Sequence, residues 1–170
     1  MQVKRLEDPR LLAGQGRFLD DITLPGLLHA AFARSEHAHA VLRGVGAAAA
    51  LPAPGVGTAL ARRGRAGVTA PIQARLEAPG FAATPWPALP TDRVRFVGEP
   101  VAVVAAVTPY AAVDGCARIA VDYDPLPAVP DVDRARDPGA ARLHPQHGSN
   151  VLFSRRGRQG DVDAAFAVAV

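Results

Sequence analysis

The sequence predicts an α+β fold in which a mixed β-sheet carries two or three helices. The run Val101–Val107 is almost entirely apolar, which is typical of a strand covered on both faces. Thr108 and Pro109 follow it directly and indicate a helix start, because threonine caps a helix well and proline suits the first helical position. Hydrophobic residues make up 49% of the 170 residues, which is enough for the core of one domain.

Two strands are predicted in the N-terminal part of the chain. A polar arm with glycine, aspartate and proline turns comes first. It leads into a strand over 28–33, where Phe32 is the candidate inward-facing side chain. A second strand is predicted over 39–46, and a single helical turn over 47–51 is stopped by the prolines that follow.

The least regular part of the sequence is 55–92, which is rich in proline and small residues. We expect a long surface loop there, anchored to the body by Phe81 and Trp86. A short alternating strand over 93–97 and a turn then lead into the central run.

The central run begins a compact strand–helix–strand unit. The helix after Pro109 is expected to bury the side that carries Val113, Cys116, Ala117 and Ala120. A strand over 118–123 is predicted to follow it, which gives a βαβ-like arrangement. Asp131 is a candidate cap for a short helix ending near 135. Asp161 is a candidate cap for a last helix over 162–170.

Composition excludes several kinds of site. The net charge of +3 comes almost entirely from arginine, but neither a recognition motif nor interleaved aromatic residues support nucleic-acid binding. Cys116 is the single cysteine, so no disulfide within the chain and no cysteine-based zinc or iron–sulfur site is possible. The N-terminus lacks the apolar region of a signal peptide, and no apolar run reaches membrane-spanning length. A cytoplasmic protein without membrane contact is expected.

The histidines are weak candidates for a metal site. His37 and His39 are two residues apart and would share one face of a strand, but no third ligand is evident. His144 and His147 lie in a loop with proline and glycine, where solvated side chains are expected.

The acidic residues suggest structural roles more than catalysis. Asp20–Asp21 and the pair Asp122 and Asp124 are expected to face solvent or cap backbone N–H groups. Glu99, between a glycine and a proline, is expected to pair with an arginine or to face another domain.

Three further features could suggest a ligand-binding or reactive site, but each has a simpler interpretation. The stretch "GQGRFL" lacks the third glycine and the preceding strand of a dinucleotide fingerprint. Cys116 is expected to be a small core residue and not a nucleophile. Two arginine clusters offer phosphate binding, but solvated loops are the simpler interpretation: Arg62, Arg63 and Arg65, and Arg155, Arg156 and Arg158. We therefore predict no catalytic, cofactor-binding or metal-binding residue in this chain.

Four blocks of the sequence, in order, resemble one known family. They are "VKRLEDPRLLAGQGRFLDDITLPGLLHAAFARSEHAHA", "TDRVRFVGEPVAVVAAVTPYAAVDGCARIAVDYDPLPAV", "LHPQHGSNV" and "GDVDAAFA". The chain resembles the start of the large, molybdopterin-binding subunit of the xanthine dehydrogenase, aldehyde oxidase and aerobic carbon monoxide dehydrogenase family. The resemblance implies the α/β-hammerhead fold over 1–150, with an N-terminal arm and the long loop near 55–92. Residues 151–170 would begin the connection to a molybdopterin-binding domain.

The resemblance also implies an oxidoreductase chemistry. Members of the family are molybdenum hydroxylases that oxidise a carbon centre with oxygen from water at molybdopterin-bound molybdenum. Electrons leave through iron–sulfur clusters and flavin, often on separate subunits. The sequence stops where the catalytic region of the family begins, so no cofactor is expected on this chain alone. Members of the family have an apolar strand at the position of 55–67, which here reads "GVGTALARRGRAG". The sequence therefore does not decide whether this strand forms.

These observations predict a truncated or split portion of such a large subunit, with a structural, subunit-packing role and no turnover alone. The expected partners are a molybdopterin-binding domain or chain and iron–sulfur and flavin subunits. The alternative is a free-standing, non-catalytic binding or assembly module.

Overall fold

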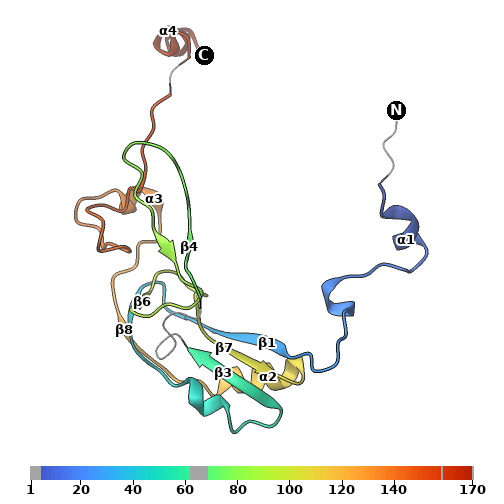
Figure 1. Cartoon of the computed structure of the whole chain (residues 1–170). Coiled ribbons are helices and arrows are strands. Elements are labelled where there is room, and N and C mark those ends of the chain that lie inside the picture. Colours follow the sequence, from blue (N-terminus) through green and yellow to red (C-terminus); the bar gives the residue numbers. More distant parts are fainter. Residues whose placement is uncertain (1–4, 62–68, 158, 170) are drawn as a thin grey trace.

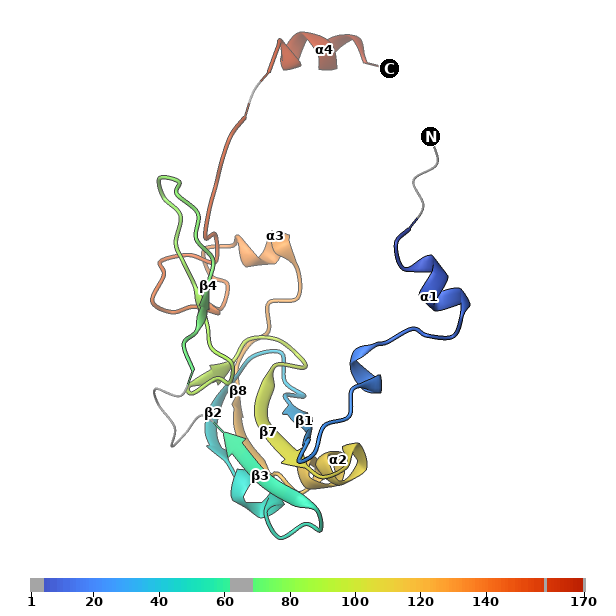
Figure 2. The ribbon, with the colours of Figure 1, turned by 45° about the vertical axis from the view of Figure 1, so that its right-hand side comes forward.

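The structure of the chain is a computed structural model that describes residues 5–61, 69–157 and 159–169. Three small β-sheets and a packed helix form the body, and an arm at each end of the chain projects from it (Figure 1). The arms carry the terminal helices α1 (Asp8–Leu12) and α4 (Val162–Val168). Figure 2 shows the two arms reaching toward the end of the molecule opposite β3 (Val56–Ala61).

The first sheet is built around β7 (Pro100–Ala106), the apolar run of the sequence. It pairs on one side with β1 (His29–Arg34) and on the other with β3, both antiparallel. The prediction of a central strand over 101–107 is therefore confirmed. The expectation of an unbroken loop over 55–92 is wrong, because β3 lies within that stretch and supplies the strand that the sequence left open. Residues 62–68 lie outside the described residues.

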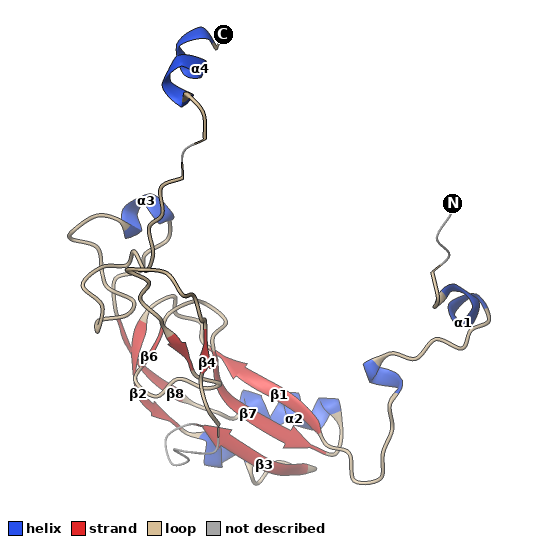
Figure 3. Cartoon of the chain, turned by 45° about the horizontal axis from the view of Figure 1, so that its top comes forward, coloured by secondary structure: helices blue, strands red, loops and turns tan. Residues whose placement is uncertain are grey.

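Helix α2 (Pro109–Ala117) packs against β1 and β7, as Figure 3 shows. The Oγ1 of Thr108 accepts a hydrogen bond from the N–H of Ala111, and Pro109 is the first helical residue, so the predicted helix start is confirmed. The buried face is not the predicted one, however. Ala112 and Gly115 are buried, whereas Val113 is exposed. The smallest side chains face the sheet because the helix lies very close to it.

The second sheet has the order β6–β2–β8, all antiparallel: β6 (Arg93–Val94), β2 (Ala40–Val45) and β8 (Val121–Pro125). Because β7 and β8 belong to different sheets, the unit around α2 is not a βαβ unit. All strand pairs between described residues are antiparallel, so three antiparallel sheets replace the expected mixed sheet. The α+β class with helices on small sheets is nevertheless confirmed.

The third sheet is a two-stranded hairpin of β4 (Ile72–Gln73) and β5 (Pro85–Trp86). Its anchoring by aromatic residues is confirmed. The ring of Phe81 lies edge-on to Phe153 with centroids 6.2 Å apart, and the N–H of Ala82 donates to the carbonyl of Leu152. The hairpin and the segment that leads to α4 therefore run side by side.

The core joins the first two sheets through a cluster of Ala40, Leu42, Val94 and Val101. Phe32 is not part of the core, although the sequence suggested it. It is 46% exposed, and the guanidinium of Arg34 lies over its ring, 5.6 Å from the centroid. Alternate residues of β1 are more buried than Phe32.

Three further helices of the described residues are only three or four residues long. They are η1 (Leu19–Asp21), η2 (Ala47–Ala50) and α3 (Val132–Ala135). The carboxylate of Asp131 accepts from the N–H of Arg134, and that of Asp161 accepts from the N–H of Ala164, so both predicted caps are confirmed. Of the helices in the described ranges, none has the length and apolar character needed to cross a bilayer.

Candidate functional site

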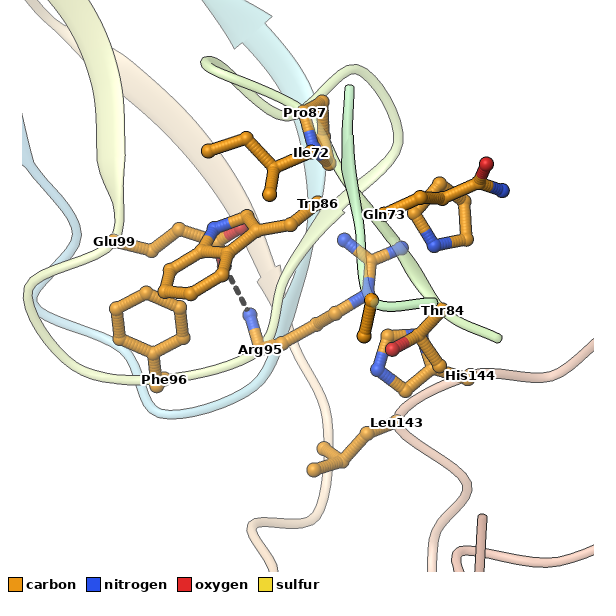
Figure 4. A pocket seen from close by; sticks show the side chains of 12 residues that line it. Ile72, Gln73, Thr84, Trp86, Pro87, Arg95, Phe96, Glu99, Leu143 and His144 are labelled. Carbon is orange, nitrogen blue, oxygen red and sulfur yellow. Dashed lines mark hydrogen bonds between the residues drawn. The ribbon is translucent and has the colours of Figure 1, made fainter. Parts of the chain in front are cut away.

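An apolar pocket of about 470 Å³ lies between the β4–β5 hairpin, the turn that precedes β7 and the loop at 143–144 (Figure 4). Its volume falls in the range typical of small-molecule sites, which is about 300–1,000 Å³. Segments far apart in the sequence meet here, so the fold and not a sequence motif creates the pocket.

Aromatic side chains form one wall of the pocket. The rings of Trp86 and Phe96 meet edge to face, with centroids 6.0 Å apart and planes at 89°. Ile72 lies opposite Trp86 in the hairpin register. All three side chains are exposed, and Trp86 keeps 57% of its surface open to solvent. Such a wall offers apolar area and edge-to-face contacts to a partner.

The turn at 96–99 places a buried carboxylate beside this wall. Gly98 adopts a φ of +86°, which side chains rarely tolerate, and its N–H donates to the carbonyl of Ser35 at the end of β1. Glu99 is only 2% exposed, and its carboxylate accepts from the backbone N–H of Arg95 at 2.6 Å. Burial raises the pKa of Glu99, although this hydrogen bond and the charge of Arg95 act in the opposite direction.

The guanidinium of Arg95 is held away from that carboxylate. It donates to the carbonyl of Arg93 at 3.0 Å and forms an ion pair with Asp92 at 3.1 Å. Burial alone would raise the pKa of Asp92, but the charge of Arg95 and hydrogen bonds from both arginines lower it. The Nε of Arg95 is buried and has no hydrogen-bond partner among the described residues.

Histidines of the C-terminal loop close the other side of the pocket. Both His144 and His147 are half-buried, so the expectation of solvated side chains is wrong. Asn150 organises the loop, because its side chain accepts from Leu143 and donates to the carbonyl of Ala141. Burial, followed by the charge of Arg95, lowers the pKa of His144 and favours the neutral imidazole at pH 7. Asn150 did not emerge from the sequence, where only the turn-forming "GSN" could have indicated it.

The first histidine pair does not form a metal site. His39 is buried and its Nδ1 lies 3.0 Å from the carbonyl oxygen of Pro127, whereas His37 packs edge-on to the ring of Tyr123. Throughout the described ranges, no three His, Cys, Asp or Glu side chains are grouped so that they could hold a metal ion.

The other acidic residues considered for catalysis make structural contacts. The carboxylate of Asp21 accepts from the N–H of Phe18, and Asp124 pairs with Arg43 across β2 and β8 at 2.5 Å. Both acids are exposed, as predicted.

The remaining candidates offer no binding group. Cys116 is half-buried, and burial raises the pKa of its thiol, which disfavours the reactive thiolate. Arg155 and Arg156 are exposed on the segment before α4. Arg62, Arg63, Arg65 and Arg158 lie outside the described residues.

The chain matches the family described as aldehyde oxidase and xanthine dehydrogenase, a/b hammerhead domain, over residues 13–127, and it belongs to that family. The nicotine 6-hydroxylase large subunit of Paenarthrobacter nicotinovorans is 39% identical over 168 residues, which are 99% of this chain and 20% of the relative. The chain thus spans about a fifth of the length of the curated relatives it matches.

Two solved structures show the same fold. Quinoline 2-oxidoreductase from Pseudomonas putida 86 superposes with a TM-score of 0.81 at 39% identity, over 86% of this chain and 19% of that one. The Cu,Mo-containing CO dehydrogenase in its carbon monoxide reduced state superposes with a TM-score of 0.70 at 33% identity, over 82% of this chain and 17% of that one. The predicted hammerhead fold is therefore confirmed.

Enzymes of this family are molybdenum hydroxylases that use molybdopterin. The pocket residues do not fit that cofactor. Arg95 is committed to Asp92, so it is a poor phosphate ligand, and the buried carboxylate of Glu99 would repel a phosphate.

Proposed function

We propose that this chain is the N-terminal hammerhead portion of a molybdenum hydroxylase large subunit and that its role is structural. It would provide a scaffold on which a molybdopterin-binding domain and neighbouring subunits pack, and it would not turn over substrate alone. Residues 1–150 would form the hammerhead unit, and 151–170 would begin the connection to the rest of the subunit.

The observation that carries this proposal is the extent of the match. Nearly the whole chain corresponds to about a fifth of a relative that is named as a large subunit, and that name identifies one chain of a multi-subunit enzyme. The solved structure of quinoline 2-oxidoreductase shows the same correspondence at the level of fold. A unit of this kind is expected to act through the larger assembly that contains it.

Exposed apolar side chains on both arms support a packing role. In the N-terminal arm, Leu6, Leu12 and Leu19 are almost fully exposed, and in α4 Phe166 and Val168 are 77% and 80% exposed. Monomeric soluble proteins rarely leave such apolar surface open, and larger patches usually mark interaction sites. A larger partner body would bury these side chains.

The proposal can be tested with the purified chain and with a chimaera. In the chimaera, this chain replaces the matched region of the nicotine 6-hydroxylase large subunit, which is expressed with its own partner subunits. We expect the chimaera to retain molybdenum, measured by elemental analysis, and the isolated chain to contain none after expression in a host that makes molybdopterin. Stoichiometric molybdenum or aldehyde, purine or carbon monoxide oxidation by the isolated chain would overturn the proposal.

A free-standing binding or assembly module is the second candidate, because the pocket's volume of about 470 Å³ falls in the range of small-molecule sites. The DNA downstream distinguishes the two functions. A reading frame that continues the large subunit supports the scaffold, whereas unrelated genes favour the module.

A further inference from the structure

We propose that the pocket formed by Ile72, Trp86, Phe96 and Arg95 is the docking site for the molybdopterin-binding part of the large subunit. The inference rests on the proposed function and names the surface through which that function would act. The occupant would insert an apolar side chain against the aromatic wall and present a backbone carbonyl to the Nε of Arg95.

The first argument is the exposure of the wall. Trp86 is 57% exposed and Ile72 is 73% exposed, and both project from a hairpin of only two short strands. Tryptophan and arginine are the residue types most enriched where protein partners bind tightly. The wall therefore suits a polypeptide better than a small molecule.

The second argument is an unsatisfied donor at the same place. The Nε of Arg95 is buried but has no hydrogen-bond partner among the described residues, whereas the two terminal nitrogens of the same guanidinium are engaged. A buried donor without an acceptor is costly, so such groups are nearly always paired in complete structures. An acceptor from a covering segment would complete this site.

The third argument is the position of the pocket in the chain. The hairpin that carries Ile72 and Trp86 is hydrogen-bonded to the segment at 152, which leads to the exposed helix α4. The pocket and α4 thus lie along one continuous stretch of the body and C-terminal arm. About four fifths of the nicotine 6-hydroxylase large subunit and of a carbon monoxide dehydrogenase large chain lies outside the part that this chain matches, so these relatives contain a body large enough to cover this stretch.

Trp86 is the only tryptophan of the chain, which gives a specific readout. Hydroxyl-radical footprinting with mass spectrometry would compare the oxidation rate of Trp86 in the isolated chain and in the molybdenum-containing chimaera. Burial in a docked core should slow this oxidation, because the indole would lose its contact with solvent. Ile72→Asp would place a carboxylate in the pocket and should return Trp86 in the chimaera to the rate of the isolated chain. The matched control is Tyr110→Asp on α2, where Tyr110 is 82% exposed and outside the pocket, and it should leave the protection intact.

The outcomes separate the two proposals. A chimaera that contains no molybdenum counts against the proposed function. A molybdenum-containing chimaera in which Trp86 reacts as fast as in the isolated chain overturns the docking inference alone. Equal loss of protection with Ile72→Asp and Tyr110→Asp would also overturn it, because the effect would then not belong to the pocket. Protection that appears in the isolated chain together with dimer formation in size-exclusion chromatography would assign the pocket to a second copy instead.

Discussion

Gly115→Ala should destabilise the chain, although alanine normally stabilises a helix. Gly115 lies in α2 where the helix faces the first sheet. A Cβ at this position would lie 2.9 Å from Cγ1 of Val104 and 3.0 Å from Cγ2 of Val56. Both neighbours are β-branched valines, whose side chains have few alternative rotamers, and Val104 is fully buried. The helix would therefore have to move away from the sheet.

The magnitude follows from two opposing effects. Replacing glycine by alanine inside a helix gains about 1 kcal/mol of intrinsic helix propensity. Overpacking a well-packed core costs about 1–3 kcal/mol. Because the contact with Val104 is shorter than real Cβ contacts and the contact with Val56 is tighter than most of them, we expect the upper part of that range and a net loss of about 1–2 kcal/mol. For a chain of this size the melting temperature should fall by about 2–8 °C.

Urea and thermal unfolding of the isolated chain, followed by circular dichroism, would measure this loss. Gly139→Ala is the matched control, since a Cβ there meets nothing within 4 Å and the φ angle is not in the left-handed region. Val104→Ala should be destabilising alone but should relieve part of the Gly115→Ala penalty, with a coupling of about 1 kcal/mol in the double-mutant cycle. A stabilised Gly115→Ala variant, or strictly additive effects, would refute the close packing of α2 on β7.

Three further predictions concern single contacts. Burial raises the folded-state pKa of Glu99, so folding favours the protonated carboxyl. The stability that the protonated form provides is complete below the ordinary pKa of 4.5 and is lost as pH rises through the folded-state pKa. Glu99→Gln should remove that decline in urea unfolding measured from pH 4 to 8, and an unchanged pH profile would contradict the assignment. Thr108→Ala should cost about 1 kcal/mol of unfolding free energy, because the N–H of Ala111 loses its cap, whereas Thr108→Ser should retain most of it. A double-mutant cycle on the exposed pair of Arg43 and Asp124 should give a coupling below about 1 kcal/mol that weakens further with salt, and a larger value would require a less solvated pair.

Local chemistry explains which parts of the fold could be predicted from the sequence. The caps at Thr108, Asp131 and Asp161 depend only on residues three positions away, and all three form. The strand β7 was equally evident, because a long apolar run has few other places to lie. Such elements can be predicted from neighbouring residues alone, without knowledge of distant contacts.

Alanine-rich elements were harder to interpret, because alanine gives little contrast between faces. In β1, "HAAFAR", size suggested that Phe32 points inward, but Ala31 and Ala33 occupy more buried positions than Phe32 does. In α2 the distance to the sheet selects Ala112 and Gly115 over Val113. A pattern based on side-chain hydrophobicity misassigns a face when close backbone approach decides the packing.

The pocket was beyond prediction for a different reason. Glu99 and His144 were singled out separately, and Trp86 was recognised only as an anchor, but their meeting depends on contacts across more than one sheet and a long loop. Spacing along the chain carries no information about such contacts. The buried Nε of Arg95 likewise becomes visible only once the neighbours of the guanidinium are known.

The composition of the core connects the fold to the proposed role. Among the described residues, most of the buried apolar side chains are alanines, and the largest fully buried side chain is that of Glu99. Alanine buries little area, and a buried carboxylate opposes folding more as pH rises, so this core supplies little hydrophobic free energy for its size. Many large apolar side chains are instead exposed, among them several on the arms and around the pocket. A partner that binds only the folded chain would bury that surface and stabilise the fold by mass action. We therefore expect the stability of this unit to depend on the assembly that contains it.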